Sequence, residues 1–160
     1  MKTYIAIDNG ATGTYCIMSQ EGIKHGPLPT KKAINYQKKK QEITRIDHEK
    51  FNTFLGEISS GSEACLVVIE RPFVNPHGFK ATTSGLRAFE SVLIGVERNG
   101  LGHVFVDSRE WQKSLLPSGI KGRAELKKAS VDVAARLFPQ IKTKDADSIL
   151  MAEWARRSNL

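Results

Sequence analysis

Apolar and polar residues alternate over short segments in the first thirty positions of the chain. Residues 3–8, TYIAID, alternate and stop at an Asp-Asn-Gly turn, and an apolar pattern resumes over residues 14–18. Because a period of two is typical of half-buried strands, these segments predict two strands joined by a tight turn. A third strand over residues 23–27 would complete a meander.

The rest of the chain alternates between apolar runs and segments with helical spacing. After Asp47, the residues that fall on one helical stripe are Phe51, Phe54, Leu55 and Ile58, and a Gly/Ser cluster ends this helix. Strands are expected over residues 66–69 and 103–106, and further helices over residues 83–98, 124–138 and 146–157. This order indicates an α/β fold in which a mixed five-stranded sheet is flanked by helices.

Composition narrows the range of partners. The chain has 160 residues, 40% hydrophobic content and a formal net charge of +7, which suit one domain over residues 1–160 and favour a polyanionic partner such as nucleic acid. Asp8 interrupts the N-terminal apolar segment, and the longest apolar run covers only residues 64–69, so neither a signal peptide nor a membrane span is expected. Cys16 and Cys65 form no CxxC pair, which predicts reduced, structural thiols in a cytoplasmic protein.

Two carboxylates stand at matching points of two apolar strands. Asp8 ends the strand YIAI, and Glu70 ends the strand LVVI. If these strands are neighbours, their ends lie about 4.8 Å apart, and repulsion between the acids raises a pKa unless a cation neutralises them. Because the expected ligands are oxygens, without the Cys/His set that zinc prefers, Mg²⁺ is the expected cofactor and Mn²⁺ would substitute.

The last expected helix adds a third acid. Asp147 lies on the same helical stripe as the apolar residues of segment 150–154, which points its side chain towards the core. Asp145 lies at the start of this helix, where it is either a simple N-cap or a further metal ligand. Together with the two acids at the strand ends, Asp147 favours a metal site over isolated turn residues.

Six blocks in this order resemble the RuvC-like Holliday junction resolvases, especially the short phage-type members. The blocks are IAIDNGATGT, VVIERPF, FESVLIGVERNG, VDSREWQKSLL, KGRAELKKASVDVAARLFP and KDADSILMAEWARR. They span nearly the whole chain. The resemblance implies an RNase H-like fold, a homodimer, and Mg²⁺-dependent paired nicking of four-way DNA junctions.

The resemblance also assigns roles to particular positions. It implies that the metal-binding catalytic acids are Asp8, Glu70, Asp145 and Asp147. Asp8 would bridge two ions, and Lys127 would lie near the scissile phosphate. Many relatives carry a His or Asp one turn before the final acid, whereas a lysine holds that position here. Which of Asp145 and Asp147 completes the second metal site therefore stays open.

Further positions are expected to contact DNA. Phe73 resembles the family aromatic that wedges against bases at the junction centre, and a core phenylalanine is the alternative. Arg71 and Lys80 flank the loop after Glu70 and would position a junction arm, unless they are ordinary solvated charges. Residues 31–40 form either a solvated loop or hairpin, or an arm that follows phosphates. Contacts to backbone phosphates are expected from Lys31, Lys32, Lys38, Lys39, Lys40, Lys121, Arg123 and Lys128.

Packing or solvent contact, rather than chemistry, is expected for other side chains. Trp111 is interpreted as a packing anchor, Glu153 as a surface residue, and the four histidines as surface groups. The helix over residues 83–98 carries apolar residues on more than one face, so it would pack both inward and against the second subunit of a homodimer.

The site and the resemblance together predict a metal-dependent, structure-selective endodeoxyribonuclease that resolves four-way (Holliday) DNA junctions by paired symmetric nicks. The main alternative is an RNase H-like nuclease that acts on flaps, branched replication intermediates or RNA. The stretch IAIDNGATGT also resembles the phosphate loop of actin-like ATPases and sugar kinases, but those proteins need two such domains. A catalytically silent junction-binding module is the third alternative.

Overall fold

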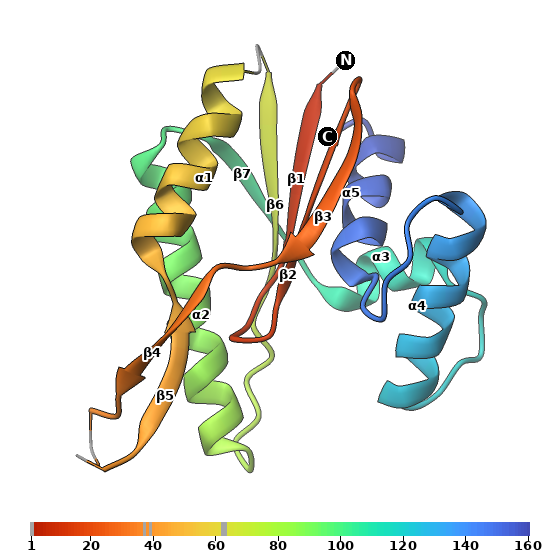
Figure 1. Cartoon of the computed structure of the whole chain (residues 1–160). Coiled ribbons are helices and arrows are strands. Elements are labelled where there is room, and N and C mark those ends of the chain that lie inside the picture. Colours follow the sequence, from red (N-terminus) through yellow and green to blue (C-terminus); the bar gives the residue numbers. More distant parts are fainter. Residues whose placement is uncertain (1, 37, 39, 62–63) are drawn as a thin grey trace.

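A central β-sheet organises the computed structural model, which describes residues 2–36, 38, 40–61 and 64–160. The five-stranded sheet has the order β3-β2-β1-β6-β7. Its strands are β1 (Thr3–Asp8), β2 (Thr14–Ser19), β3 (Gly22–Pro27), β6 (Cys65–Glu70) and β7 (Gly102–Val106). Strands β1, β2 and β3 form an antiparallel meander, whereas β6 and β7 run parallel to β1. The predicted mixed five-stranded sheet is confirmed (Figure 1).

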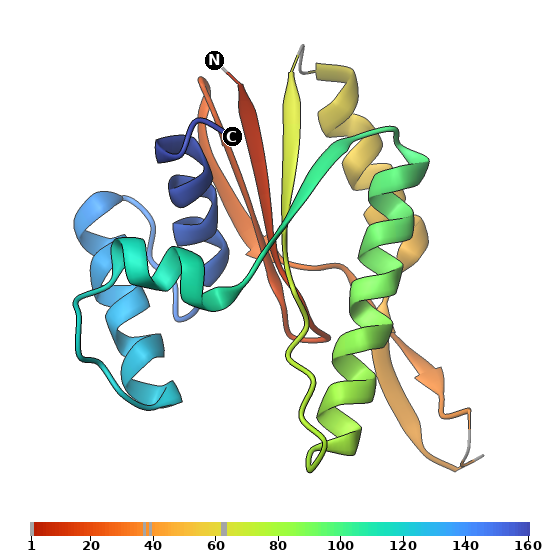
Figure 2. The same ribbon diagram turned by 180° about the vertical axis from the view of Figure 1, so that it is seen from behind.

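Helices cover both faces of this sheet. Helices α1 (His48–Gly61) and α2 (Phe79–Arg98) lie on one face, and α3 (Ser108–Leu115), α4 (Arg123–Leu137) and α5 (Asp147–Arg157) lie on the other (Figures 1 and 2). Successive residues of β1 point to opposite faces, so Ile5 and Ile7 pack under the first pair of helices while Tyr4 and Ala6 pack under α5. The sheet therefore separates two hydrophobic cores.

The contact between α1 and α2 depends on a glycine. A side-chain carbon at Gly95 of α2 would lie 2.9 Å from the ring of Phe51 on α1. Phe51 and Leu55 are fully buried at this contact. The close approach of the two helices therefore requires the absence of a side chain at this position.

Residues 30–46 form a hairpin that projects from the sheet (Figure 1). Its strands are β4 (Thr30–Ile34) and β5 (Glu42–Ile46), which pair only with each other in the described part of the chain. The guanidinium of Arg87 on α2 lies 5.6 Å from the ring centroid of Tyr36, and Lys31 forms an ion pair of 3.5 Å with Asp47. Of the structures expected for residues 31–40, the hairpin is confirmed.

The structure corrects several expectations about individual elements and side chains. Helix α3 lacks a matching sequence prediction, and α2 begins four residues before the expected start. Glu153, expected on the surface, is buried. Its carboxylate forms ion pairs with Arg156 at 2.7 Å and with Arg157 at 2.6 Å. His48 and His77 are exposed as predicted, whereas His25 and His103 are half-buried. Trp111 is fully buried, which confirms a packing role.

No helix within the described ranges has the length and apolar character needed to span a bilayer.

Candidate active site

Four acids lie at or near the ends of β1 and β6 and the start of α5, which meet at the lower end of the sheet as it is drawn in Figure 1. Asp8 ends β1 and Glu70 ends β6, and these strands are parallel neighbours with Ile7 opposite Ile69. Asp147 is the first residue of α5, which packs across β1 and β2. One carboxylate oxygen from each of Asp8, Asp145 and Asp147 lies within 4.8 Å of the other two. Glu70 lies outside this set of three but interacts with Asp8.

A tight turn and two hydrogen bonds hold the elements that carry these acids in place. A side chain at Gly13 would overlap the carbonyl oxygen of Asp8, so only glycine allows the turn between β1 and β2 to close this tightly. The Asn9 side chain donates a hydrogen bond of 2.9 Å to the backbone oxygen of Glu70. The buried hydroxyls of Thr14 and Ser148 are 2.8 Å apart and link β2 to the start of α5. The tight turn and these two side-chain hydrogen bonds therefore fix the ends of β1 and β6 and the start of α5 relative to one another.

Asp145 is not a helix cap. Helix α5 follows Ala146, and no side chain caps its start. The Asp145 carboxylate instead forms an ion pair of 2.8 Å with Lys127 of α4. The simple capping interpretation is therefore wrong, and Asp145 belongs to the same group of charges as Asp147 and Lys127.

Burial and crowding oppose ionisation of these acids. Burial, followed by the charge of Glu70, raises the pKa of Asp8 from 3.8 to about 9. Burial also raises the pKa of Glu70 and of Asp147. The hydrogen bond to Asp145 raises the pKa of Lys127, so this lysine stays protonated. Such a group of acids can ionise together near neutral pH only if positive charge compensates them.

The donor atoms of the cluster fit a divalent cation. The Oδ1 atoms of Asp145 and Asp147 are buried and have no hydrogen-bond partner in the described residues. Buried carboxylate oxygens without donors are unfavourable unless a cation fills their coordination. The cluster offers oxygens and no thiolate or imidazole, which suits hard ions such as Mg²⁺ or Mn²⁺. This acidic cluster can therefore hold a metal ion.

A cleft of about 730 Å³ opens over the acids. Asp8, Glu70 and Asp147 line it, and four basic side chains also line it: Arg71, Arg109, Arg123 and Lys127. Sequence reasoning did not single out other lining residues, namely Asn9, Arg109, Gln112 and Ser130. Arg109 and Gln112 lie on α3, so the missed helix explains the two omissions. A cleft lined by both acidic and basic side chains suits a phosphodiester backbone bound through metal ions.

The residues expected near the junction centre lie around this cleft. Phe73 is 83% exposed and lines the cleft, which excludes the alternative of a core phenylalanine. Arg71 forms an ion pair of 3.7 Å with Asp107, and its guanidinium lies 5.4 Å from the ring centroid of Phe105. Lys80 is exposed in the first turn of α2, beyond the residues that line the cleft.

The remaining basic residues fall into two groups. Arg123 lines the cleft, and Lys121 and Lys128 are exposed close to it in sequence, before and within α4. Lys31, Lys32, Lys38 and Lys40 belong to the hairpin segment, where Lys32 donates a hydrogen bond of 2.9 Å to Thr44. Lys39 lies outside the described residues.

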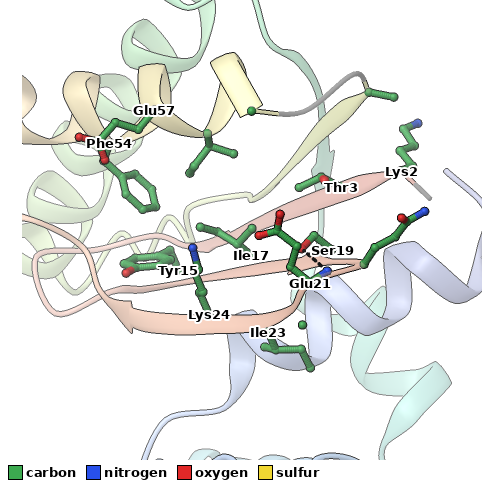
Figure 3. Close-up of a pocket in the computed structure, with 15 residues that line it drawn as sticks. Lys2, Thr3, Tyr15, Ile17, Ser19, Glu21, Ile23, Lys24, Phe54 and Glu57 are labelled. Atoms are coloured by element: carbon green, nitrogen blue, oxygen red, sulfur yellow. Dashed lines mark hydrogen bonds between the residues drawn. The ribbon is translucent and has the colours of Figure 1, made fainter.

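A second cavity, of about 910 Å³, lies between α1 and the β1-β2-β3 meander (Figure 3). Tyr15, Ile17 and Phe54 supply apolar lining, with Lys24 and Glu57 among the charged lining residues. None of the four converging acids lines it. The cleft over Asp8 and Asp147 is therefore the candidate active site, although it is the smaller of the two.

Comparison with known proteins relates the chain to RuvC by structure. No protein-family model and no curated protein matches the sequence. The solved complex of T. thermophilus RuvC with a Holliday junction substrate aligns with a TM-score of 0.56 at 10% identity, covering 99% of this chain and 96% of that chain. A further Thermus thermophilus RuvC structure aligns with a TM-score of 0.55 at 14% identity, covering 98% and 96%. The chain therefore has a RuvC-like fold, which is the RNase H-like α/β architecture expected from the sequence.

Proposed function

We propose that the chain is a metal-dependent, structure-selective endodeoxyribonuclease that resolves four-way DNA junctions by paired symmetric nicks. The observation that carries this proposal is the convergence of Asp8, Asp145 and Asp147 beside Glu70, at the edge of a cleft that basic side chains also line. The shared fold with a RuvC that was solved with a Holliday junction substrate supports the choice of DNA substrate.

The acids would hold the metal and the lysine would contact the phosphate. Asp8 would occupy the central position, because its carboxylate lies within 4.8 Å of those of Asp145 and Asp147 and also interacts with Glu70. Bound Mg²⁺ or Mn²⁺ would supply an activated water and neutralise charge that develops on the phosphate. Asp145 holds the ammonium of Lys127 at 2.8 Å, which orients this donor beside the acids. From there Lys127 would donate to a non-bridging phosphate oxygen.

Side chains around the cleft would bind the junction. Phe73 presents an exposed ring next to the acids, where it would stack on bases without reading their sequence. Arg71 and Lys80 would position an arm, and the remaining DNA contacts would be to phosphates. Their candidates are Lys31, Lys32, Lys38, Lys39, Lys40, Lys121, Arg123 and Lys128. Such contacts give affinity and salt dependence without sequence preference.

Paired nicks require two active sites, which we propose come from a homodimer. Phe79, Leu86 and Ile94 recur at intervals of seven and eight residues on α2, so they share one side of the helix. They are 72%, 43% and 54% exposed. An exposed apolar stripe of this kind suits a symmetric contact between two copies of α2.

The direct test is cleavage of an end-labelled four-way DNA junction beside linear duplex, a flap and an RNA/DNA hybrid. We expect paired nicks near the crossover with Mg²⁺ and none with EDTA. Cleavage only of the flap or the hybrid would overturn the junction assignment and favour the nuclease alternative, which the RNase H-like fold also suits. Tight junction binding without cleavage in any metal would instead identify a binding module.

A further inference from the structure

We infer that Trp111 is a positioning residue for Glu70, because its indole N–H fixes the carboxylate that stands beside Asp8. This inference rests on the proposed function of the acidic site and adds a residue that lies outside the metal-binding set. Trp111 would act through Glu70 and would contact neither metal nor DNA.

The contact itself is direct. Trp111 Nε1 donates a hydrogen bond of 3.3 Å to Oε1 of Glu70. The indole is fully buried, and its nitrogen can only donate, so it needs an acceptor inside the protein. Glu70 supplies this acceptor. A phenylalanine would fill much of the same space but would leave the carboxylate without the donor.

The carboxylates of Glu70 and Asp145 differ in the kind of partner that contacts them. Asp145 is paired with Lys127, whereas no lysine or arginine forms an ion pair with Glu70 among the residues that the structure describes. The neighbouring Arg71 turns instead to Asp107. The neutral donor of Trp111 therefore orients Glu70 without cancelling the negative charge that a cation would need.

Packing around the indole makes it a rigid support. Trp111 belongs to the same buried cluster as Val106 of β7 and Leu150 of α5. Helix α3 packs against α5, the helix that begins with Asp147. The indole therefore contacts Glu70 at the end of β6 and also packs in the core beneath α5, the helix that begins with Asp147. The same buried ring thus supports the elements that carry both acids.

The experiment compares Trp111→Phe with Trp154→Phe, the same substitution at the other tryptophan of the chain, which packs at the edge of the same core. Mn²⁺ binding is measured by calorimetry on the full chain without DNA, and the half-saturating Mg²⁺ concentration is measured by junction cleavage. Loss of an outer hydrogen bond to a metal ligand typically lowers metal affinity by about 10-fold or more. We expect this loss in both measurements for Trp111→Phe and no change for Trp154→Phe.

A shape-preserving replacement separates positioning from packing. In the Trp154→Phe background, incorporation of 3-benzothienylalanine in place of tryptophan exchanges the N–H of residue 111 for sulfur and keeps the bicyclic ring. We expect weaker Mn²⁺ binding with an unchanged melting temperature, and this comparison decides the matter if Trp111→Phe does not fold.

The outcomes separate this inference from the proposed function. Unchanged Mn²⁺ affinity and Mg²⁺ dependence in the benzothienyl protein, with normal junction cleavage, would overturn the role of Trp111 and leave the nuclease standing. A wild-type protein that binds Mn²⁺ but cuts no junction would contradict the proposed function, while the binding comparison would still test Trp111. A wild-type protein that binds no Mn²⁺ would overturn both.

Discussion

Asp8 and Glu70 lie side by side at the ends of parallel strands, where burial disfavours the charged form of both and the charge of Glu70 further disfavours that of Asp8. The pKa of Asp8 is raised to about 9 from an ordinary value of 3.8. A raised carboxyl pKa means that the folded state holds the proton more tightly than the unfolded state. The resulting stabilisation is complete below about pH 4 and is lost as the pH rises towards 9. At neutral pH without metal, this acid therefore destabilises the fold.

We predict that Asp8→Asn stabilises the metal-free protein. At pH 8 in EDTA, replacing Asp8 should raise the free energy of unfolding by on the order of 2 kcal/mol, because the folded wild type must hold a proton that the unfolded chain releases. Below pH 4 the two proteins should differ little. Urea denaturation across this pH range measures the effect. Mg²⁺ should stabilise the wild type more than the variant, and a variant less stable than the wild type at pH 8 would contradict this account.

Sequence reasoning reaches some residues of the site and misses others for a physical reason. An acid that ends an apolar strand is visible in the local pattern, as for Asp8 and Glu70, and Asp147 is visible on the apolar stripe of a helix. Their catalytic roles stay predictions. The burial of Glu153 and the hydrogen bond of Trp111 could not be predicted, because these depend on packing and side-chain orientation. The apolar character of Trp111 predicts burial but gives no sign of a hydrogen bond to Glu70.

Elements with a clear apolar pattern were predictable, whereas the shortest helix and the polar hairpin strands were not. The five strands of the sheet and four of the helices follow from their apolar patterns. Helix α3 has only 8 residues, about two turns, which is too few to establish a helical period. Strand β5 contains only two apolar residues, so the hairpin could be expected only as one alternative.

At the level of helix packing, we predict opposite effects for two glycines of α2. Gly95→Ala would press a methyl group against Phe51, so it should destabilise the protein by about 1–3 kcal/mol. Gly85 has no atom within 4 Å of an added side-chain carbon, so Gly85→Ala should be neutral or stabilise by up to about 1 kcal/mol. Thermal unfolding checks both. Equal effects at the two positions would argue against the close α1–α2 contact.

The hairpin is expected to bind DNA through charge. Lys32, Lys38 and Lys40 are exposed, so replacing all three with glutamine should weaken junction binding and flatten its salt dependence. Each lost phosphate contact lowers the slope of log affinity against log salt by about 0.9. Binding measured over a salt series tests this, with Lys24→Gln beside the second cavity as the control. An unchanged slope in the triple variant would show that the hairpin lies away from DNA.

For the whole molecule, the account requires two active sites that act together. Leu86→Glu combined with Ile94→Glu should disrupt the proposed α2 contact, because each places a charge in an apolar interface. We expect a monomer by light scattering, and unpaired nicks in place of paired ones. Leu137→Glu changes an exposed leucine on α4 and should leave the dimer intact. A wild-type protein that is monomeric on the junction would refute this arrangement.

The central claim is that the acids at the strand ends and on α5 form a metal-dependent site for junction cleavage. The most direct measurement compares Asp147→Asn with Asp132→Asn, an exposed acid on α4, for binding and single-turnover cleavage of a four-way junction with Mg²⁺. We predict that Asp147→Asn slows cleavage by about 10³-fold or more while junction affinity stays within a few-fold. Asp132→Asn should cleave normally. Wild-type cleavage by Asp147→Asn would contradict the assignment of the site.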